Sequence, residues 1–415
     1  MKAEIITIGD ELLLGQVIDT NSSWLGQQLN QLGIQVHYKS ALPDDKEAIL
    51  DGLRHAKERS NIIIITGGLG PTKDDITKNT LCDFFETRLV QNEKVLEWVT
   101  SIFKMRNLPM LESNNQQAML PENSRVLWNR NGTAPGMWFL EDGKVFISMP
   151  GVPFEMKTIF EEEVVPLLKE TFSFPSIVHR TILTSSIGES FLANKISHIE
   201  DALPSHIKLA YLPSVGMVRL RFSAYGENTE QLNLELQPII DALYETIGTY
   251  IYGEGEDNLA QVVGMLLKGK GKTIGTAESC TGGYMAHMIT LNSGSSSYFK
   301  GSIISYSNEV KINQLGVDPK IIETYGAVSE DCVKAMAEGA RMVLKTDYSI
   351  AASGIAGPDG GTQEKPVGTV WIAISTPNQT VAKRLNLGDN RERTIQRTAI
   401  QALDTLRKIL LEETE

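Results

Sequence analysis

The sequence is poor in cysteine, in basic charge and in long apolar runs. Three cysteines among 415 residues, Cys82, Cys280 and Cys332, cannot build a disulfide framework and predict a reducing, cytoplasmic setting. Acidic residues outnumber basic ones by 51 to 39, for a formal charge of −12 without any basic run, so we expect no nucleic-acid groove. No apolar stretch approaches the roughly 20 residues of a membrane span, and we expect neither a membrane partner nor a signal peptide.

Residues 1–170 alternate between strand and helix patterns, which predicts a doubly wound α/β sheet. The run Asn-Ile-Ile-Ile-Ile-Thr at 61–66 is typical of a central parallel strand that is covered on both faces. We also expect strands at 3–8 and 34–39, and helices at 21–32 and 46–58.

Glycines and carboxylates follow two of these strands. Asp10 comes directly after the first strand, and GGLGPTKDDIT at 67–77 follows the central one. The glycines would give a phosphate-sized turn, and Asp74 and Asp75 would begin the next helix. Carboxylates in this place either hold a divalent cation beside a phosphate, or only favour the positive end of the helix dipole. The residues alone favour neither alternative.

A smaller α+β pattern occupies residues 171–251. Its turn SIGES at 186–190 is not the GXXG clamp of RNA-binding domains, and the acidic surroundings argue against RNA. We interpret the segment as a spacer or dimerisation piece, with a glycine-rich, charged linker at 252–258 behind it. The expected elements are a linker at 173–176, strands at 179–184, 207–212 and 216–225, and helices at 188–199 and 229–247.

The last part of the chain is organised around TAESCTGG at 276–283. A buried strand at 272–275 precedes it and a helix at 284–291 follows, so Ser279 lies where a strand turns into a helix. If a base reaches Ser279, it is a nucleophile; otherwise it only caps the helix. Its neighbour Cys280 is a rival nucleophile. Only one of the two adjacent side chains can face the ligand, and the residues alone do not say which one.

The residues after Ser279 are expected to bind a ligand. Gly282 and Gly283 would let it come close to the backbone. We expect the first amides of the helix, near Cys280 and Thr281, to be unpaired, with the helix dipole behind them. Such amides bind an anion or stabilise an oxyanion.

Two later stretches would meet Ser279 at the same edge of the sheet. The segment 301–311 predicts a strand and then a helix, and brings Tyr306 and Lys311 out at the strand end. A lysine in a dry site can be the base for a serine, whereas most lysines are solvated charges. The segment 352–361 holds four glycines after a strand at 348–352, and its amides can cradle a phosphate.

The rest of this part repeats the strand and helix alternation, which predicts a third, α/β domain. Ser329 would cap the helix at 330–344. Further helices are expected at 259–268 and 391–411, and antiparallel strands at 367–374 and 380–387.

Several long motifs resemble those of the CinA family, named for competence/damage-inducible protein A. In the C-terminal third they are TAESCTGG, KGSIISYSNEVK, YGAVSE and SGIAGPDGGTQEKPVGTVWIA, and in the first part GGLGPTKDDIT, NGTAPGM and MPGVPFEM. The resemblance implies an α/β chain of three domains. These would be a doubly wound, molybdopterin-binding-like sheet at 1–170, a KH-like α+β connecting domain at 171–251, and a nicotinamide-nucleotide amidase domain at 252–415.

For the C-terminal domain, the resemblance implies hydrolysis of nicotinamide mononucleotide to nicotinate mononucleotide and ammonia, without a cofactor. Ser279 would attack the amide, Lys311 would take its proton, and Tyr306 would orient Lys311 or pass the proton to ammonia. The expected binding residues are Cys280, Thr281, Gly282 and Gly283 at the reacting group, and Ser353, Gly354, Gly357, Gly360 and Arg391 at the phosphate.

For the N-terminal domain, the resemblance implies ADP-ribose pyrophosphatase activity with a divalent cation such as magnesium, manganese or cobalt. The alternative is a nucleotide- or pterin-binding module without turnover. The expected metal ligands are Asp10, Asp74, Asp75 and Glu155, and the expected nucleotide-binding residues are Gly67, Gly68, Gly70, Asn131 and Gly132. The family also implies a cytoplasmic homodimer that acts in pyridine-nucleotide salvage.

Overall fold

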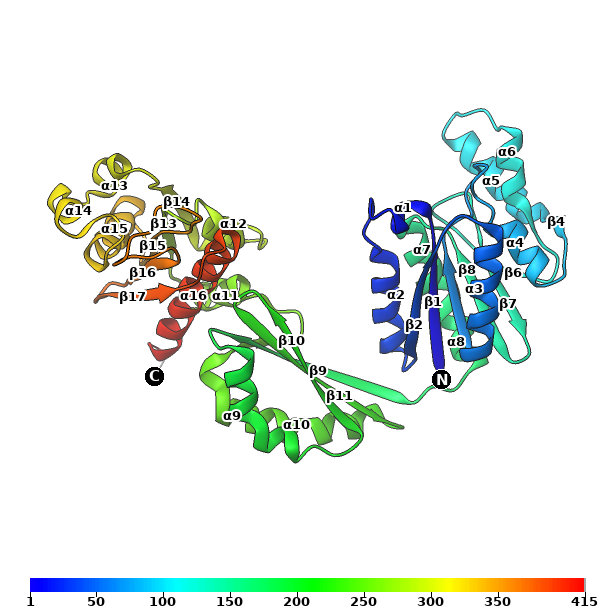
Figure 1. Cartoon of the computed structure of the whole chain (residues 1–415), viewed down its shortest axis with the longest axis horizontal. Helices are drawn as coiled ribbons and strands as arrows, with labels where there is room; N and C mark the ends of the chain where they lie inside the picture. Colours follow the sequence, from blue (N-terminus) through cyan, green and yellow to red (C-terminus); the bar gives the residue numbers. More distant parts are fainter. Residues whose placement is uncertain (414–415) are drawn as a thin grey trace. The chain divides into compact units, whose positions relative to one another are not determined.

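The computed structural model of the protein describes residues 1–413 (Figure 1). Its packing separates two units, and each is described by itself. One holds Met1–Ile177 with 225–229, and the other holds Val178–Ala224 with the chain from Glu230 onward. The connecting and C-terminal domains expected from the sequence therefore pack as one unit.

The first unit is built on a six-stranded sheet of order β2-β1-β3-β8-β7-β6. The first four strands are parallel. Strand β7 runs antiparallel to β8, and β6 runs antiparallel to β7, so the fold is α/β as predicted, with antiparallel pairing at this edge. The run of isoleucines is the central strand β3 (Ile62–Thr66), and all its residues are buried. The other strands are β1 (Lys2–Ile8), β2 (Gln35–Leu42), β6 (Arg125–Leu127), β7 (Gly136–Glu141) and β8 (Lys144–Met149), with a separate pair β4 (Leu89–Gln91) and β5 (Met119–Pro121).

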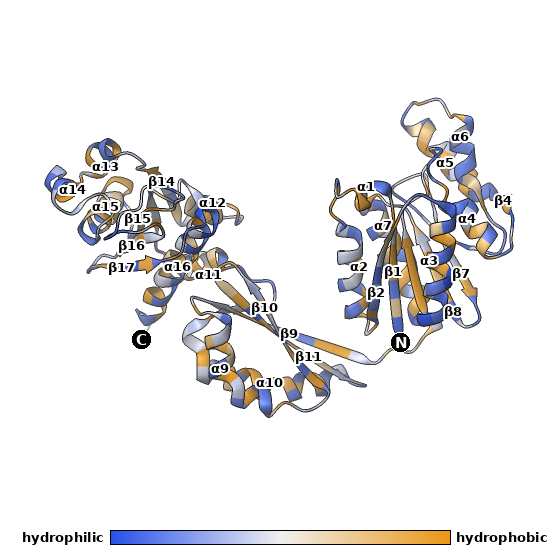
Figure 2. Ribbon diagram, viewed as in Figure 1, coloured by the Kyte–Doolittle hydropathy of each residue, from blue (hydrophilic) through white to orange (hydrophobic). Residues whose placement is uncertain are grey.

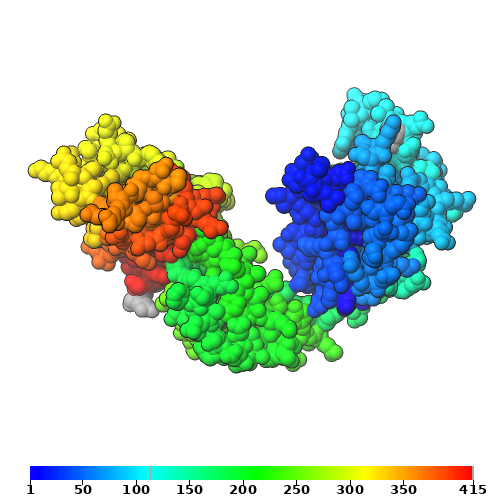
Figure 3. Space-filling model, in the orientation of Figure 1, coloured from blue at the N-terminus to red at the C-terminus, as the bar shows by residue number. Residues whose placement is uncertain are grey.

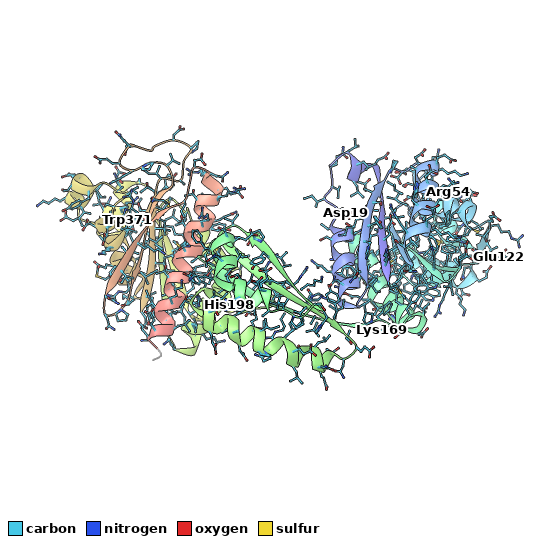
Figure 4. The ribbon with its side chains drawn as sticks, turned by 60° about the horizontal axis from the view of Figure 1, so that its bottom comes forward. Asp19, Arg54, Glu122, Lys169, His198 and Trp371 are labelled. Atoms are coloured by element: carbon cyan, nitrogen blue, oxygen red, sulfur yellow. The ribbon has the colours of Figure 1, made fainter. Side chains whose placement is uncertain are left out.

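Helices cover both faces of this sheet (Figures 1 and 2). Ile62 and Ile64 point to one face and Ile63 and Ile65 to the other, because side chains alternate along a strand. Helices α2 and α7 pack on the first face, and α3, α4 and α5 on the second. Asp19, labelled in Figure 4, caps α2 by accepting from the Ser22 N–H at 2.9 Å. The helices are α1 (Asp10–Leu13), α2 (Thr20–Gln31), α3 (Lys46–Arg59), α4 (Thr77–Phe84), α5 (Glu93–Met105), α6 (Glu112–Asn115), α7 (Pro153–Ile159) and α8 (Val165–Thr171).

The connecting segment forms a four-stranded sheet of order β10-β11-β9-β12. Helices α9 and α10 bury their apolar sides against it, as the α+β pattern predicted. The last strand runs to Glu254, beyond the expected boundary at residue 251. The elements are β9 (Ser176–Ser185), α9 (Glu189–Asp201), β10 (Ile207–Ser214), β11 (Met217–Gly226), α10 (Thr229–Ile247) and β12 (Ile251–Glu254).

The C-terminal segment forms a five-stranded sheet of order β14-β13-β15-β16-β17. Strand β13 (Ile274–Glu278) lies parallel between β14 and β15, and every residue in it is buried. The strand was predicted at 272–275, too early, because small and polar residues at its end hid its continuation. The antiparallel pairing of β16 and β17 and the Ser329 cap are confirmed. The other strands are β14 (Phe299–Ile304), β15 (Tyr348–Gly354), β16 (Thr369–Ser375) and β17 (Thr380–Asn386), and the helices are α11 (Leu259–Gly269), α12 (Tyr284–Thr290), α13 (Asn308–Leu315), α14 (Pro319–Tyr325), α15 (Glu330–Leu344) and α16 (Arg391–Glu412).

Helix α16 contacts both of these sheets, and in Figure 3 the red surface of the C-terminal end lies against the green surface of the connecting segment. The buried Arg407 guanidinium donates to the carbonyls of Ile251 and Thr249, at 2.9 and 3.0 Å. Asp404 accepts from the Ser186 hydroxyl at 2.7 Å, and Leu183 of β9 lies in the core of the C-terminal sheet. Since a buried charge network is costly to break, the connecting segment is more than a loose spacer.

The three cysteines of the described chain are buried free thiols. Among residues 1–413, no helix is both long and apolar enough to cross a bilayer.

Candidate active site

Ser279 stands at the carboxyl end of β13, directly after Glu278. Its backbone N–H donates to the carbonyl of Ala352 at 3.0 Å, which ties it to the neighbouring strand β15. Ser279 is 8% exposed. The carboxyl ends of parallel strands are the usual ligand-binding edge of an α/β sheet. The fold therefore places a nearly buried hydroxyl where a ligand can reach it.

The Lys311 amine lies beside this hydroxyl. Its Nζ is 3.1 Å from Ser279 Oγ, although the two residues are 32 positions apart. Helix α13, which Ser307 caps, carries Lys311 back over the strand end. The lysine is only 2% exposed, and burial lowers the pKa of its amine. A neutral amine is therefore more accessible here than on an ordinary surface lysine.

Three oxygen atoms surround the amine, and they can serve both its protonated and its neutral form. Lys311 Nζ donates to the carbonyl of Ser305 at 2.8 Å and lies 3.4 Å from that of Tyr306. A neutral amine has two hydrogens and one lone pair. If the two carbonyls accept these hydrogens, the lone pair is left for the Ser279 hydroxyl to donate to; the protonated amine instead donates its third hydrogen to Ser279 Oγ. The neutral form gives the arrangement of a general base and its nucleophile.

The Cys280 side chain is packed into the core. It lies in the cluster that includes Met285 and Ile289 of α12, and the residue is 6% exposed. Burial raises the pKa of the thiol to about 12, so it stays protonated at neutral pH. Of the two adjacent residues, Ser279 is the one that contacts Lys311.

The prediction that the first amides of α12 are unpaired is wrong. The carboxylate of Glu278 accepts hydrogen bonds from the N–H groups of Gly283, Met285 and Ala286, at 3.0, 3.0 and 2.8 Å. No sign of these bonds is visible in the order of the residues, because an acidic residue before a serine can equally face solvent. Within the described chain, the N–H groups of Cys280 and Thr281 donate to no other residue, so these two amides remain for the expected oxyanion site.

The two glycines of this turn allow backbone conformations that other residues rarely adopt. Gly282 and Gly283 have φ values of 59° and 101°, which L side chains rarely adopt. At Gly282 an added Cβ would meet nothing within 4 Å, so the backbone there is open to a ligand. At Gly283 it would lie 3.2 Å from Ile304 Cδ1.

Tyr306 and Arg391 form a second group near the dyad. Tyr306 is 62% exposed, and its hydroxyl accepts from Arg391 Nη2 at 3.2 Å. Arg391 Nη1 donates to the carbonyl of Gly357 at 2.8 Å. The Tyr306 hydroxyl thus contacts Arg391, and only the Tyr306 carbonyl contacts Lys311. We expected the Tyr306 hydroxyl to orient Lys311 or to pass the proton to ammonia, and this geometry does not support that role.

The glycine-rich loop is only partly available to a ligand. The Ser353 hydroxyl donates to the carbonyl of Ala327 at 2.7 Å and the residue is 1% exposed, so this hydroxyl is already used within the protein. Gly354 packs against Val370, whose Cγ2 would lie 2.6 Å from an added Cβ. Gly357 is buried but offers its carbonyl to Arg391, whereas Gly360 is exposed.

Two buried hydroxyls near the dyad lack a partner in the described chain. They belong to Thr281, which is 4% exposed, and to Ser305, which is fully buried. Ser305 was not singled out from the sequence; its position at the end of a strand beside Tyr306 was the available signal. An unpaired buried hydroxyl is costly, which favours a bound ligand group or water at these atoms.

In the first unit, the loop after β3 is closely packed. Gly67 has a φ of 117°, and a Cβ there would lie 2.1 Å from the carbonyl oxygen of Ile8, so only glycine fits. At Gly68 it would lie 2.1 Å from Thr77 Oγ1, and at Gly70 2.5 Å from Asp75 Oδ2. These glycines bring the loop against β1 and α4, rather than only exposing amides.

The four predicted metal ligands do not converge. Asp75 accepts from the Thr72 N–H and hydroxyl, and a hydrogen bond from Thr72 lowers the pKa of the exposed Asp74. Glu155 accepts from Asn129 Nδ2 at 2.5 Å. Among residues 1–413, no three Asp, Glu, His or Cys side chains are grouped to hold a metal.

The loop 129–132 holds the remaining predicted residues. Asn131 Nδ2 donates to the Thr158 hydroxyl at 2.7 Å, and a Cβ on Gly132 would lie 2.2 Å from Glu155 Oε2. Both residues are therefore tied to α7. The amide of Asn131 is used within the protein rather than free for a nucleotide.

Asp10 instead meets a carboxylate that the sequence analysis missed. The Asp10 N–H donates to Asp44 Oδ2 at 3.1 Å, and the Asp44 N–H donates to Asp10 Oδ1 at 3.3 Å. Burial raises the pKa of Asp44, and the like charges of Asp10, Glu11 and Asp74 raise it further. Asp44 follows the edge strand β2, and the sequence after this strand has no motif that would single Asp44 out.

Three family models match successive parts of the chain. They are the probable molybdopterin binding domain over residues 4–170, the damage-inducible protein CinA KH domain over 179–253, and the CinA C-terminal domain over 256–410.

Similar proteins match along the whole length. The CinA-like protein of Cytophaga hutchinsonii is 50% identical over 410 residues, covering 99% of this chain and 98% of that protein. The CinA-like protein of Flavobacterium psychrophilum is 48% identical over 413 residues, covering 99% of both. Among solved structures, the competence/damage inducible protein CihA of Agrobacterium tumefaciens is 36% identical, covers 36% of this chain and 91% of that one, and has a TM-score of 0.35.

Proposed function

Since this chain belongs to the CinA family, we propose that its C-terminal domain hydrolyses the carboxamide of nicotinamide mononucleotide to a carboxylate and ammonia. The observation that carries the proposal is the buried pair of Ser279 Oγ and Lys311 Nζ at 3.1 Å. A serine with a neutral lysine is suited to acyl transfer, and hydrolysis of an amide is acyl transfer to water.

The first half-reaction forms an acyl-enzyme. Ser279 Oγ attacks the carboxamide carbon while its proton passes to Lys311 Nζ. The amides of Cys280 and Thr281 face the oxyanion of the tetrahedral intermediate. When the carbon–nitrogen bond breaks, Lys311 returns the proton to the leaving nitrogen, which departs as ammonia.

The second half-reaction restores the enzyme. A water molecule attacks the ester carbonyl and gives one proton to Lys311. The ester bond breaks, nicotinate mononucleotide is released, and the proton returns to Ser279 Oγ. No atom in either half-reaction needs a metal or a redox cofactor for its balance.

The phosphate of the substrate would be held by Arg391. The guanidinium is exposed and has no carboxylate partner in the described chain, and it lies between the Tyr306 hydroxyl and the glycine-rich loop. Arginine binds phosphate through two parallel N–H groups, so Arg391 would leave Tyr306 or Gly357 when substrate enters.

Mass spectrometry of the protein mixed with substrate tests this proposal. An acyl group on the peptide that contains Ser279, formed and lost at the rate of ammonia release, is expected. Product formation without any adduct under rapid quenching, or an adduct on Cys280, would contradict the proposed chemistry.

A metal-dependent ADP-ribose pyrophosphatase in the first unit is the second function that we propose. The observation in its favour is the repulsion of the Asp44 carboxylate by the charges of Asp10, Glu11 and Asp74, which a cation would relieve. An ion of the magnesium type uses one or two carboxylates and completes its shell with phosphate oxygens and water. Asp10 and Asp44 would hold such an ion only together with the diphosphate, whose charge it would neutralise.

Titration of ADP-ribose with and without magnesium separates turnover from binding. Release of AMP only with the cation supports the pyrophosphatase. Binding without AMP release would support a nucleotide-binding module, and neither would reject both.

We also propose that the protein acts as a cytoplasmic homodimer in pyridine-nucleotide salvage. Family membership and the buried free thiols support this assignment. Sedimentation equilibrium at micromolar concentration tests the oligomeric state, and a single species of monomer mass would contradict it.

A further inference from the structure

Glu278 is a fully buried carboxylate next to the nucleophile, and the chemistry proposed above does not use it. Three of its hydrogen bonds come from backbone amides at the start of α12, and two come from hydroxyls on β13 and β14. Oε2 accepts from the N–H groups of Gly283 and Met285, both at 3.0 Å, and Oε1 accepts from the Ala286 N–H at 2.8 Å, the Thr276 hydroxyl at 3.3 Å and the Ser302 hydroxyl at 3.4 Å. Buried charges are tolerated when they are bonded in this way.

These bonds fix one end of the turn at residues 279–283, which carries Ser279 from β13 into α12. The near end is fixed where the Ser279 N–H donates to Ala352 on β15, at 3.0 Å. The far end is fixed where the Glu278 carboxylate takes amides of the first turn of α12. Between these two ends lie the Ser279 side chain and the backbone amides of Cys280 and Thr281. These are the groups that the proposed reaction uses.

The carboxylate also changes what the helix can supply. A helix N-terminus normally offers unpaired amides and a positive dipole end to an anion. Here Glu278 occupies that position, so stabilisation of an oxyanion depends on the two remaining amides, Cys280 and Thr281, and on how accurately they are placed.

We propose that Glu278 is a positioning residue. Its carboxylate ties α12 back onto the end of β13, keeps Ser279 Oγ against Lys311 Nζ, and aims the amides of Cys280 and Thr281 at the oxyanion. This inference rests on the amidase function proposed above. It assigns Glu278 no proton transfer, because each of its oxygens is already taken by at least two donors.

Glutamine at this position tests the proposal. The side chain of Glu278→Gln has the same shape, but its amide group has one acceptor oxygen and would turn an NH₂ toward N–H groups that need an acceptor. The turn must shift, and a misplacement of about 1 Å costs about 100-fold in rate. We expect kcat for nicotinamide mononucleotide to fall about 100-fold with KM changed less than about threefold, since substrate contacts are kept.

Asp347→Asn is the matched control. Asp347 is also a carboxylate that accepts from a backbone amide, that of Thr273 at 2.9 Å, but it lies at the opposite end of β13 from Ser279. Its substitution should lower the melting temperature and leave kcat unchanged. A similar loss of kcat in both variants would show general destabilisation and overturn the positioning role.

The pH profile separates positioning from proton transfer. In Glu278→Gln the acid limb of kcat against pH should keep the midpoint of the parent, because Lys311 remains the base. Loss of that limb would make Glu278 a base and overturn the proposal, as would a parent-like kcat. If the glutamine variant does not fold, Glu278→Asp is measured instead; it keeps the charge but withdraws it by one methylene, and parent-like kcat there would also overturn the proposal.

Labelling of Ser279 with a fluorophosphonate gives a readout that needs no nucleotide. We expect the labelling rate of the folded Glu278→Gln variant to fall, and that of Asp347→Asn to match the parent. If the parent labels but releases no ammonia, the amidase function fails while this comparison still decides the role of Glu278. Equal labelling of all three proteins would refute the role whatever the substrate.

Discussion

Replacement of Lys311 by methionine separates the base from the rest of the site. The substitution keeps a long side chain in a position that is 2% exposed and removes the Nζ that lies 3.1 Å from Ser279 Oγ. Loss of a general base costs about 10²–10⁴-fold in rate, or about 2.7–5.4 kcal/mol of transition-state stabilisation. We expect kcat in Lys311→Met to fall within that range.

The same variant should remain folded. The carbonyl of Ser305 loses a donor at 2.8 Å, which costs about 1–3 kcal/mol of stability. Against this, the buried methionine carries no desolvation cost of an amine. The two effects oppose each other, so the melting temperature should change far less than the rate does.

The pH dependence follows from the direction of the lysine shift. Only the neutral amine can take the proton, and burial places the pKa of Lys311 below the ordinary 10.5. The kcat of the parent should therefore rise about tenfold per pH unit at low pH and level off below pH 10.5. Lys311→Met should show no such limb.

The assay is ammonia release from nicotinamide mononucleotide across this pH range, with thermal melting of each protein. Lys300→Met is the matched control, because Lys300 is an exposed lysine on the neighbouring strand β14, and its rate should equal that of the parent. A loss of less than about tenfold in Lys311→Met, or a flat profile in the parent, would refute the assignment of the base.

Three further outcomes are expected. Cys280→Ala should keep kcat and lose about 1 kcal/mol of stability by urea unfolding, because the thiol only fills the core; loss of turnover would make Cys280 the nucleophile. Arg391→Ala should raise KM for nicotinamide mononucleotide about 10–100-fold, but not KM for the riboside, which lacks the phosphate. The control Arg393→Ala, at an exposed arginine, should change neither KM. An equal effect of Arg391→Ala on both substrates would contradict a phosphate contact. Asp44→Asn should raise the melting temperature at pH 7 by about 1–3 °C, a small gain because the group is partly exposed. Since the raised pKa of Asp44 makes its charge unfavourable above that pKa, the gain should vanish as the pH falls toward 3.8, and an undiminished gain there would contradict this origin.

The sequence predicted the parts of the site that depend on local pattern. The apolar run at β3 and the strand-to-helix change at Ser279 are local features, and the rule that parallel strands end at one edge brought Lys311 to Ser279. The family motifs then restricted the choice among serine, cysteine and lysine roles.

The rest of the site depends on tertiary geometry. Whether the Glu278 side chain faces solvent or turns onto α12 is not visible in the residue order, and neither is the contact of the Tyr306 hydroxyl with Arg391, 85 positions away. The Ser353 hydroxyl was predicted to face a phosphate, but it reaches Ala327 on a separate loop. In each case two donors or acceptors compete, and only the fold decides which one is within reach.

Ammonia release from nicotinamide mononucleotide by the intact chain and by Ser279→Ala tests the central claim most directly. We predict stoichiometric release of ammonia and nicotinate mononucleotide by the parent, and none above background by a Ser279→Ala protein with the same circular dichroism spectrum. No release by the folded parent, or undiminished release by the variant, would contradict the account.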